Sequence, residues 1–122
     1  MEVAYAGSVK VCVIGAGQVG ANFSYALMIR GLAAEIVLID KNPDLAAGQA
    51  EDMSHGLRYV SPTKVHAGDY ADCDSADIVV ITAGAAQKPG ETRLDLTRRN
   101  IEVMNEIVPN LCRYANNAIV IG

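Results

Sequence analysis

The chain has 122 residues, the size of one ordinary domain with a single hydrophobic core. Apolar residues make up 51% of it and charged residues 20%, which is typical of a globular protein rather than a disordered one. The net charge of -4 and the absence of any apolar run long enough to span a bilayer make nucleic acid and membranes unexpected partners.

The first eight residues, Met1 to Ser8, have neither the basic nor the apolar region of a secretory signal. We expect them to form a flexible arm of a cytoplasmic protein, and residues 9–122 to form one domain. The cysteines are odd in number, scattered and never in a Cys-x-x-Cys pair, so we expect reduced thiols. We expect no metal site.

A short β-branched segment, Val9 to Ile14, predicts the first strand and ends in three glycines spaced Gly-x-Gly-x-x-Gly. Gly15 permits a tight turn from strand to helix, Gly17 lets a pyrophosphate approach the backbone, and Gly20 lets the helix pack closely on the strand. The apolar spacing predicts a helix over 19–30, with Gly31 as its C-cap. Unpaired N–H groups at its start favour an anion, and they belong to Gln18, Val19 and Gly20.

The second predicted strand, Glu35 to Asp40, is apolar up to its last residue, as expected of a strand buried on both faces of a parallel sheet. Asp40 follows Gly20 by twenty residues, the spacing of an acid that accepts a hydrogen bond from a ribose 2′-hydroxyl. A turn that binds nothing is the alternative interpretation. The combination of the glycines with Asp40 favours a bound dinucleotide.

The rest of the chain continues to alternate between strands and helices. This rhythm predicts an α/β fold with an open, right-handed parallel sheet of five strands in the order 3-2-1-4-5 and helices on both faces. The expected elements are a helix from Asn42-Pro43 to about Tyr59, a strand over 63–67, a turn at Gly68-Asp69-Tyr70, a brief helical piece over 73–76, a strand over 77–82, a loop over 83–93, a helix over 94–114 that Pro109 kinks or splits, and a strand over 118–121.

Five of these segments together resemble the cofactor-binding half of bacterial L-lactate dehydrogenases, which has a Rossmann-type sheet. The resemblance covers the chain after its first eight residues. The segments are Gly15 to Gly20, Asp40, Gly68 to Tyr70, Thr82 to Ala85, and the sequence Gln-Lys-Pro-Gly-Glu-Thr-Arg-Leu-Asp-Leu at 87–96. The last of these is the most specific.

The resemblance implies NAD as the cofactor and assigns roles to individual residues. Asp40 would bind the adenine ribose, Tyr70 would line the adenine pocket, and Asn100 would contact the cofactor from the long helix. Further cofactor contacts are implied for Gly15, Gly17, Gln18, Val19, Gly20, Thr82, Ala83, Gly84 and Ala85. On the residues alone, Tyr70 is equally well explained as a half-buried edge aromatic.

Two residues of the loop would act on a small 2-oxo or 2-hydroxy acid. Gln87 would face the variable end of the substrate, where relatives that act on malate carry an arginine. Arg93 would polarise the substrate carbonyl. The alternative for Arg93 is a solvated loop charge.

The family also needs a catalytic histidine, its partner aspartate and an arginine that binds the substrate carboxylate, and all three lie beyond the fifth strand. We assign His55 to a structural helix, and His66 to a strand end with no orienting carboxylate apparent in the pattern. The catalytic domain is therefore expected to be absent from this chain, which is expected to bind cofactor without turnover.

Two alternatives remain open: a relative that acts on malate, and a stand-alone NAD-binding module without catalysis. We also expect a homo-oligomer, because the apolar fifth strand would leave an uncovered sheet edge.

Overall fold

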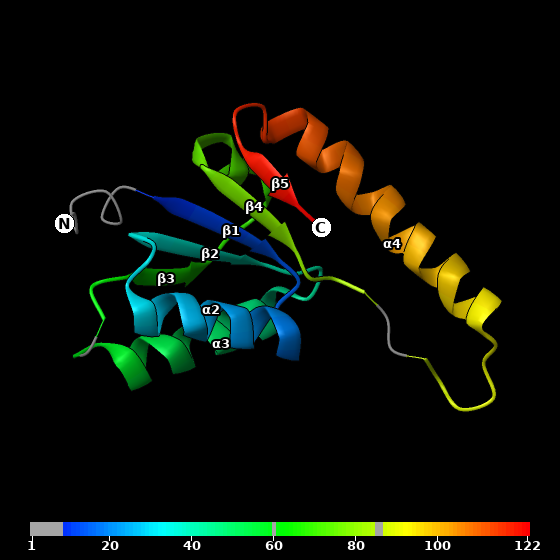
Figure 1. Cartoon of the computed structure of the whole chain (residues 1–122), viewed down its shortest axis with the longest axis horizontal. Coiled ribbons are helices and arrows are strands. Elements are labelled where there is room, and N and C mark those ends of the chain that lie inside the picture. The colour runs from blue at the N-terminus through cyan, green and yellow to red at the C-terminus, as the bar shows by residue number, and fades with distance from the viewer. Residues whose placement is uncertain (1–8, 60, 85–86) are drawn as a thin grey trace.

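A computed structural model describes residues 9–59, 61–84 and 87–122. The expected flexible arm, Met1 to Ser8, lies outside the described residues. The predicted strand order is confirmed, because the structure contains one parallel sheet in the order β3-β2-β1-β4-β5 (Figure 1). The elements are β1 (Lys10–Ile14), α2 (Gln18–Arg30), β2 (Glu35–Ile39), α3 (Pro43–Leu57), β3 (Lys64–Ala67), the 3-10 helix η1 (Tyr70–Ser75), β4 (Ile78–Ile81), α4 (Arg93–Tyr114) and β5 (Ile119–Ile121).

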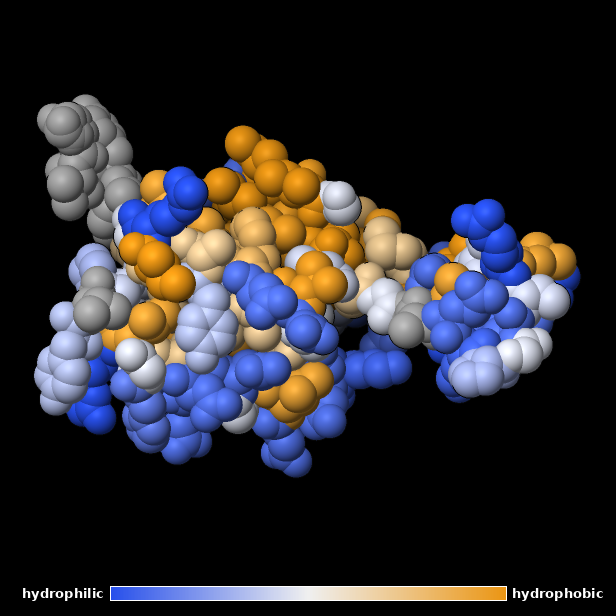
Figure 2. Space-filling model, turned by 60° about the horizontal axis from the view of Figure 1, so that its bottom comes forward, coloured by the Kyte–Doolittle hydropathy of each residue, from blue (hydrophilic) through white to orange (hydrophobic). Residues whose placement is uncertain are grey.

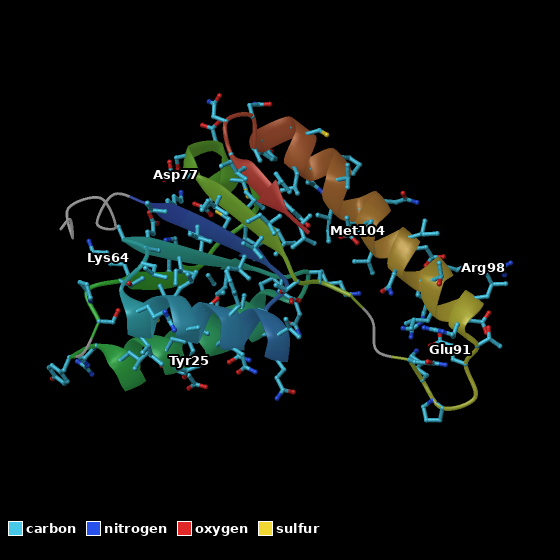
Figure 3. The ribbon with its side chains drawn as sticks, viewed as in Figure 1. Tyr25, Lys64, Asp77, Glu91, Arg98 and Met104 are labelled. Atoms are coloured by element: carbon cyan, nitrogen blue, oxygen red, sulfur yellow. The ribbon has the colours of Figure 1, made fainter. Side chains whose placement is uncertain are left out.

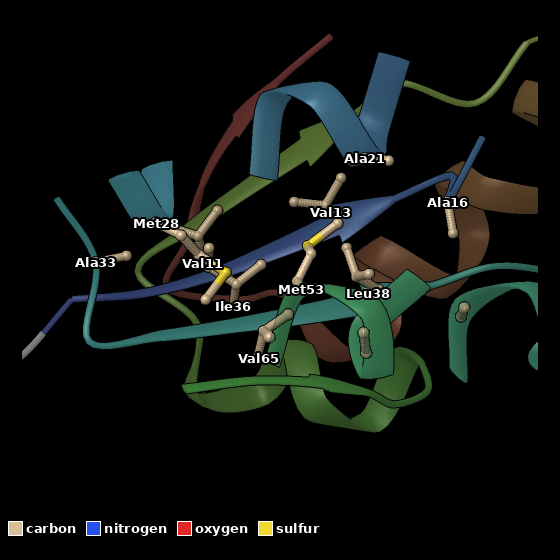
Figure 4. Packing of buried hydrophobic residues seen from close by; sticks show 12 residues of the cluster. Val11, Val13, Ala16, Ala21, Met28, Ala33, Ile36, Leu38, Met53 and Val65 are labelled. Carbon is tan, nitrogen blue, oxygen red and sulfur yellow. The ribbon is translucent and has the colours of Figure 1, made fainter. Parts of the chain in front are cut away.

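The two faces of the sheet carry separate clusters of buried side chains. Because side chains alternate along a strand, Val11 and Val13 of β1 point to one face, and Cys12 and Ile14 to the other. Helices α2 and α3 cover the first face and enclose the cluster drawn in Figure 4. The second face is covered by η1 and by the C-terminal half of α4, which buries Ile107 and Leu111.

The predicted ends of the first two helices agree with the structure to within two residues. Gly31 is the C-cap of α2 in a left-handed conformation, with φ 63°. Asn42 caps α3 by accepting a hydrogen bond from the backbone N–H of Leu45 at 3.4 Å. The third helical piece begins three residues before the predicted Cys73, because the carboxylate of Asp69 accepts from the backbone N–H of Ala71 at 3.0 Å and starts η1 at Tyr70.

The prediction that Pro109 could split the last helix is wrong, since α4 runs without a break from Arg93 to Tyr114 (Figure 1). A proline in a helix removes the N–H that would bond the carbonyl four residues earlier, here that of Asn105. Asn105 and Pro109 are both exposed, so water can satisfy the freed carbonyl. No helix among the described residues is long and apolar enough to cross a membrane.

Strand β5 forms an exposed apolar edge of the sheet. Ile119 and Ile121 pair in register with Ile78 and Val80 of β4, so they share the face that α2 and α3 cover elsewhere. They remain 66% and 50% exposed, and Figure 2 shows a hydrophobic area on this side of the molecule. Helices α2 and α3 therefore do not cover β5.

The structure corrects one expectation about His66. Its Nε2 lies 2.6 Å from Oε2 of Glu35, so a carboxylate does orient this histidine. The parallel register places His66 of β3 opposite Val37, and Glu35 lies two residues from Val37 on the same face of β2. The hydrogen bond to Glu35 raises the pKa of His66 above its ordinary value of 6.5.

The His66–Glu35 hydrogen bond predicts that the free energy of unfolding falls as the pH rises. Because the pKa of His66 is higher in the folded state, the stabilisation is complete below about pH 6.5 and is lost as the pH passes the folded value. Both side chains are more than a third exposed, so Glu35→Gln should cost only about 0.2–1 kcal/mol at pH 6, and close to nothing at pH 9. Urea unfolding at the two pH values measures this.

Glu51→Gln, which removes an exposed carboxylate from α3, serves as the matched control. An equal loss of stability for Glu35→Gln at both pH values would contradict a role of His66 ionisation.

Candidate cofactor-binding site

A cavity of about 430 Å³ lies at the carboxyl ends of β1, β2 and β4, beneath α4. The strand order reverses direction at β1, and open α/β sheets bind ligands at such a point. Seven of the predicted cofactor residues line the cavity, namely Gly15, Gly17, Asp40, Tyr70, Thr82, Ala83 and Gly84. The fold therefore brings together motifs that are more than sixty residues apart in the sequence.

The junction of β1 and α2 leaves no room for a side chain at Gly15 in the turn or at Gly20 in the first turn of the helix. Gly15 has φ 108°, and a Cβ there would lie 2.7 Å from the backbone nitrogen of Ala83. A Cβ on Gly20 would overlap the carbonyl oxygen of Gly15 and lie 2.8 Å from Oγ1 of Thr82. The Thr82 hydroxyl lies 3.0 Å from that carbonyl oxygen and donates to it, so Thr82 also fastens β4 to the turn.

The third glycine, Gly17, faces open space. A Cβ on Gly17 would meet no atom within 4 Å, so this part of the cavity can take a group that approaches the backbone closely. Gly17 is also the N-cap of α2, and it makes no side-chain cap hydrogen bond, whereas Asn42, Asp69 and Thr92 cap the other helical elements. The first turn of α2 contains no acidic residue either. The N–H groups at this helix start therefore suit the pyrophosphate of a dinucleotide.

Asp40 lies at the end of β2, and its carboxylate already holds two backbone groups. Oδ2 accepts from the N–H of Ala16 at 2.8 Å, and Oδ1 accepts from the N–H of Asn42 at 2.9 Å. A carboxylate offers about four acceptor positions, so each oxygen keeps capacity for a hydroxyl. The two backbone bonds fix the orientation of Asp40 at the wall of the cavity.

Tyr70 is half-buried at the start of η1. Burial raises the pKa of its hydroxyl, and the nearby negative charges of Glu106 and Asp40 raise it further. The phenol therefore stays protonated at neutral pH, in a residue that lines the cavity.

Sequence reasoning missed the wall of the cavity that α4 forms. This wall consists of Arg99, Glu102, Val103, Glu106 and Ile107, and Lys41 and Leu45 line the opposite side. The residues of α4 follow the i, i+3, i+4, i+7, i+8 spacing of one helix face, which could have identified them. Asn100 does not line the cavity, but its Oδ1 would lie 3.7 Å from a Cβ on Gly84.

The remaining predicted residues lie away from the cavity lining. Gln18 and Val19 are exposed at the start of α2, and Gly20 is buried in its first turn. Gln87 and Arg93 are exposed as well. The side-chain amide of Gln87 donates to the backbone carbonyl of Glu91 at 2.7 Å, and Arg93 is the first residue of α4. Ala85 lies outside the described residues.

The strand order, the glycine turn and the acid at the end of β2 together define a dinucleotide-binding domain of the Rossmann type. The family described as lactate/malate dehydrogenase, NAD binding domain, matches residues 9–122. The chain belongs to this family, and NAD is its cofactor.

Relatives of known name support this membership. The chain is 54% identical over 112 residues to L-lactate dehydrogenase 1 of Clostridium acetobutylicum, covering 92% of this chain and 36% of the relative. Among solved structures, the minor L-lactate dehydrogenase of Enterococcus mundtii is similar with a TM-score of 0.88 at 38% identity, covering 93% of this chain and 37% of that one. The malate dehydrogenase of Picrophilus torridus has a TM-score of 0.84 at 32% identity, with coverages of 92% and 36%. The chain thus spans little more than a third of their length.

The environments of Gly17 and Gly20 predict different effects of one added methyl group, on cofactor affinity at Gly17 and on stability at Gly20. Gly20→Ala should destabilise the fold by about 1–3 kcal/mol, because the methyl group overlaps the Gly15 carbonyl. Gly17→Ala should cost at most about 1 kcal/mol, because its methyl group meets open space and only the preference for glycine over alanine at an N-cap is lost. If the pyrophosphate binds over Gly17, the same methyl group should lower NADH affinity at least about tenfold, because it would occupy that space.

Chemical denaturation and titration calorimetry with NADH measure these two effects. Gly48→Ala, at an open position on α3, controls for the replacement of a helical glycine. A Gly17→Ala variant that keeps its full NADH affinity would contradict the placement of the pyrophosphate.

Proposed function

We propose that the chain is the NAD-binding part of an L-lactate dehydrogenase, an enzyme that exchanges a hydride between NADH and pyruvate. The observation that carries the cofactor placement is the cavity between Gly17 and Asp40, with an uncapped helix start at one end and a fixed carboxylate at the other. The 54% identity to a named L-lactate dehydrogenase supports the choice of reaction.

The proposed cofactor contacts follow the length of the cavity. The adenine ribose binds Asp40, and the adenine ring lies against Tyr70. The pyrophosphate lies over Gly15 and Gly17. Its oxygens accept hydrogen bonds from the backbone N–H groups of Gln18, Val19 and Gly20. Gly84 and Ala85 would run beneath the middle of the cofactor, Thr82 and Ala83 would also contact it, and Asn100 would contact it from α4.

The proposed substrate contacts come from the turn before α4. Arg93 donates to the carbonyl oxygen of pyruvate, where negative charge develops as the hydride arrives. Gln87 faces the methyl group and has no positive charge to pair with the second carboxylate of oxaloacetate. These roles require the turn to approach the cavity, because both side chains are exposed in the structure.

We further propose that the chain alone binds NAD(H) without turnover, which is the behaviour of a binding module. His55 is exposed on α3, and His66 is held by Glu35 at the edge of the sheet. Neither histidine lines the cavity, so neither can exchange a proton with a substrate there. The free thiols of the described cysteines agree with a cytoplasmic location.

The first expected result is a preference for NADH over NADPH of at least about tenfold in calorimetric titrations. A 2′-phosphate would place its charge against the Asp40 carboxylate, whereas ribose hydroxyls would donate to it. Asp40→Asn should reduce the preference, because the neutral amide removes the repulsion. Asp44→Asn, which removes a nearby exposed charge outside the cavity lining, is the control. Equal affinity of the wild-type chain for both cofactors would contradict the role of Asp40.

The second expected result concerns the substrate. The chain alone should not oxidise NADH in the presence of pyruvate. Residues 1–122 joined to a compatible catalytic half should prefer pyruvate to oxaloacetate, and Gln87→Arg should move kcat/KM toward oxaloacetate by about tenfold or more, since an unpaired buried carboxylate costs several kcal/mol. Lys88→Gln is the control for a changed charge in the same turn. A preference of the unmodified chimera for oxaloacetate would support the malate alternative.

The chain is also proposed to form a homo-oligomer through β5. The outer edge of β5 and its exposed side chains Ile119, Val120 and Ile121 can pair with the same strand of a second copy. Light scattering over a concentration series should show a dimer, and Val120→Lys should shift the equilibrium toward monomer. A strictly monomeric wild-type chain would contradict the proposal.

A further inference from the structure

The turn that precedes α4 is organised around the side chain of Glu91. Its Oε2 accepts from Nε of Arg99 at 2.6 Å, and its Oε1 accepts from Nη2 of Arg99 at 2.7 Å. Oε1 also accepts from the backbone N–H of Lys88 at 2.9 Å. The Glu91 side chain is only 12% exposed, although Gln87, Lys88, Pro89 and Gly90 are all exposed. Glu91 is therefore the least exposed residue of an exposed turn.

The backbone of Glu91 closes the same turn. Its N–H donates to the carbonyl of Lys88 at 3.0 Å, and its carbonyl accepts from the side chain of Gln87. The following residue, Thr92, is the N-cap of α4 and exchanges hydrogen bonds with Asp95. Residues 87–92 therefore form one hydrogen-bonded unit that leads directly into Arg93.

Arg99 connects this unit to the cofactor cavity. It lies six residues into α4, or about 9 Å along the helix axis, so the turn folds back along the helix to reach it. Figure 3 shows Glu91 beside the first turns of α4. Arg99 is also part of the cavity lining, together with Glu102 and Val103. One guanidinium group thus belongs both to the turn that carries Gln87 and to the wall of the cofactor site.

We infer that Glu91 is a positioning residue that, through Arg99, couples the turn of residues 87–92 to occupancy of the cofactor cavity. A dinucleotide that orders the cavity face of α4 also orders Arg99, and Arg99 holds Glu91. The turn that presents Gln87 and Arg93 is then most ordered when the cofactor is bound. This inference rests on the proposed placement of the cofactor in the cavity.

The Glu91–Arg99 ion pair is of a kind that persists at neutral pH. The two parallel N–H···O bonds from one guanidinium fix both the distance and the plane of the Glu91 carboxylate. The hydrogen bonds from Arg99 and from the Lys88 N–H lower the pKa of Glu91 to about 2, so the carboxylate stays charged at neutral pH. A lysine at 99 could not reproduce the bidentate geometry.

Hydrogen exchange at the amides of residues 87–92, measured on the chain with and without NADH, tests the inference. In the wild-type chain, NADH should slow exchange at the Lys88 amide about threefold or more. Glu91→Gln should speed that exchange about fivefold without cofactor, because the bidentate contact is lost, and should abolish the slowing by NADH. Arg99→Lys should act in the same direction. Lys88→Gln, which keeps the backbone N–H that bonds Glu91, is the matched control and should behave as wild type.

If Glu91 only stabilises the turn locally, the result will differ. Glu91→Gln would then speed exchange at the Lys88 amide, but NADH would still slow it, and this outcome would overturn the coupling. The swapped pair Glu91→Arg with Arg99→Glu should restore part of the slowing if the contact carries it. By reciprocity, Glu91→Gln can weaken NADH binding only by the factor by which NADH slows exchange in the wild type, so the variant still binds cofactor.

The test separates this inference from the proposed function. If NADH does not bind the wild-type chain, the proposed cofactor placement fails, and the coupling inferred here fails with it. If NADH binds but exchange in the turn does not respond, the placement stands and the coupling alone is overturned.

Discussion

The close contact between Gly15 and Gly20 is the constraint on which the rest of the site depends. No side-chain atom fits between the carbonyl of Gly15 and the backbone of Gly20, and the Thr82 hydroxyl bonds that same carbonyl. This contact sets the spacing of α2 from β1 and ties β4 to both. The cavity, the open position at Gly17 and the orientation of the α2 start all follow from it.

The two halves of α4 serve different purposes. The C-terminal half buries Ile107 and Leu111 against η1 and the sheet, and so anchors the helix. The N-terminal half has Leu94 and Ile101 exposed at 59% and 53%, and it presents Arg99 and Glu102 to the cavity. The anchored half supplies stability, and the other half supplies polar groups to the cavity wall and follows directly on the turn of residues 87–92. Pro109 lies within the anchored half, where packing holds the helix together despite the missing hydrogen bond.

Features encoded by neighbouring residues could be predicted from the sequence, and features made by distant residues could not. The cap at Asn42 and the left-handed Gly31 follow from local patterns, and the strand order follows from the regular alternation of strands and helices. The contact of His66 with Glu35 depends on the register of β2 against β3, which no local pattern specifies. The α4 wall of the cavity depends on how a long helix lies over the sheet. The fold of the turn at 87–92 depends on Glu91 reaching Arg99, a contact that the sequence motif does not display.

The missing side-chain cap of α2 would make a bound dinucleotide a part of the folded structure. Asn42, Asp69 and Thr92 complete the other helix starts from within the chain, but Gly17 offers no such group. A bound pyrophosphate would supply the acceptors that the first turn of α2 lacks, in the way that a capping side chain does. On binding, the strand-to-helix junction would then gain the acceptors that the other helix starts already have within the chain. The cellular level of the cofactor would in this way set how much of the protein is fully folded.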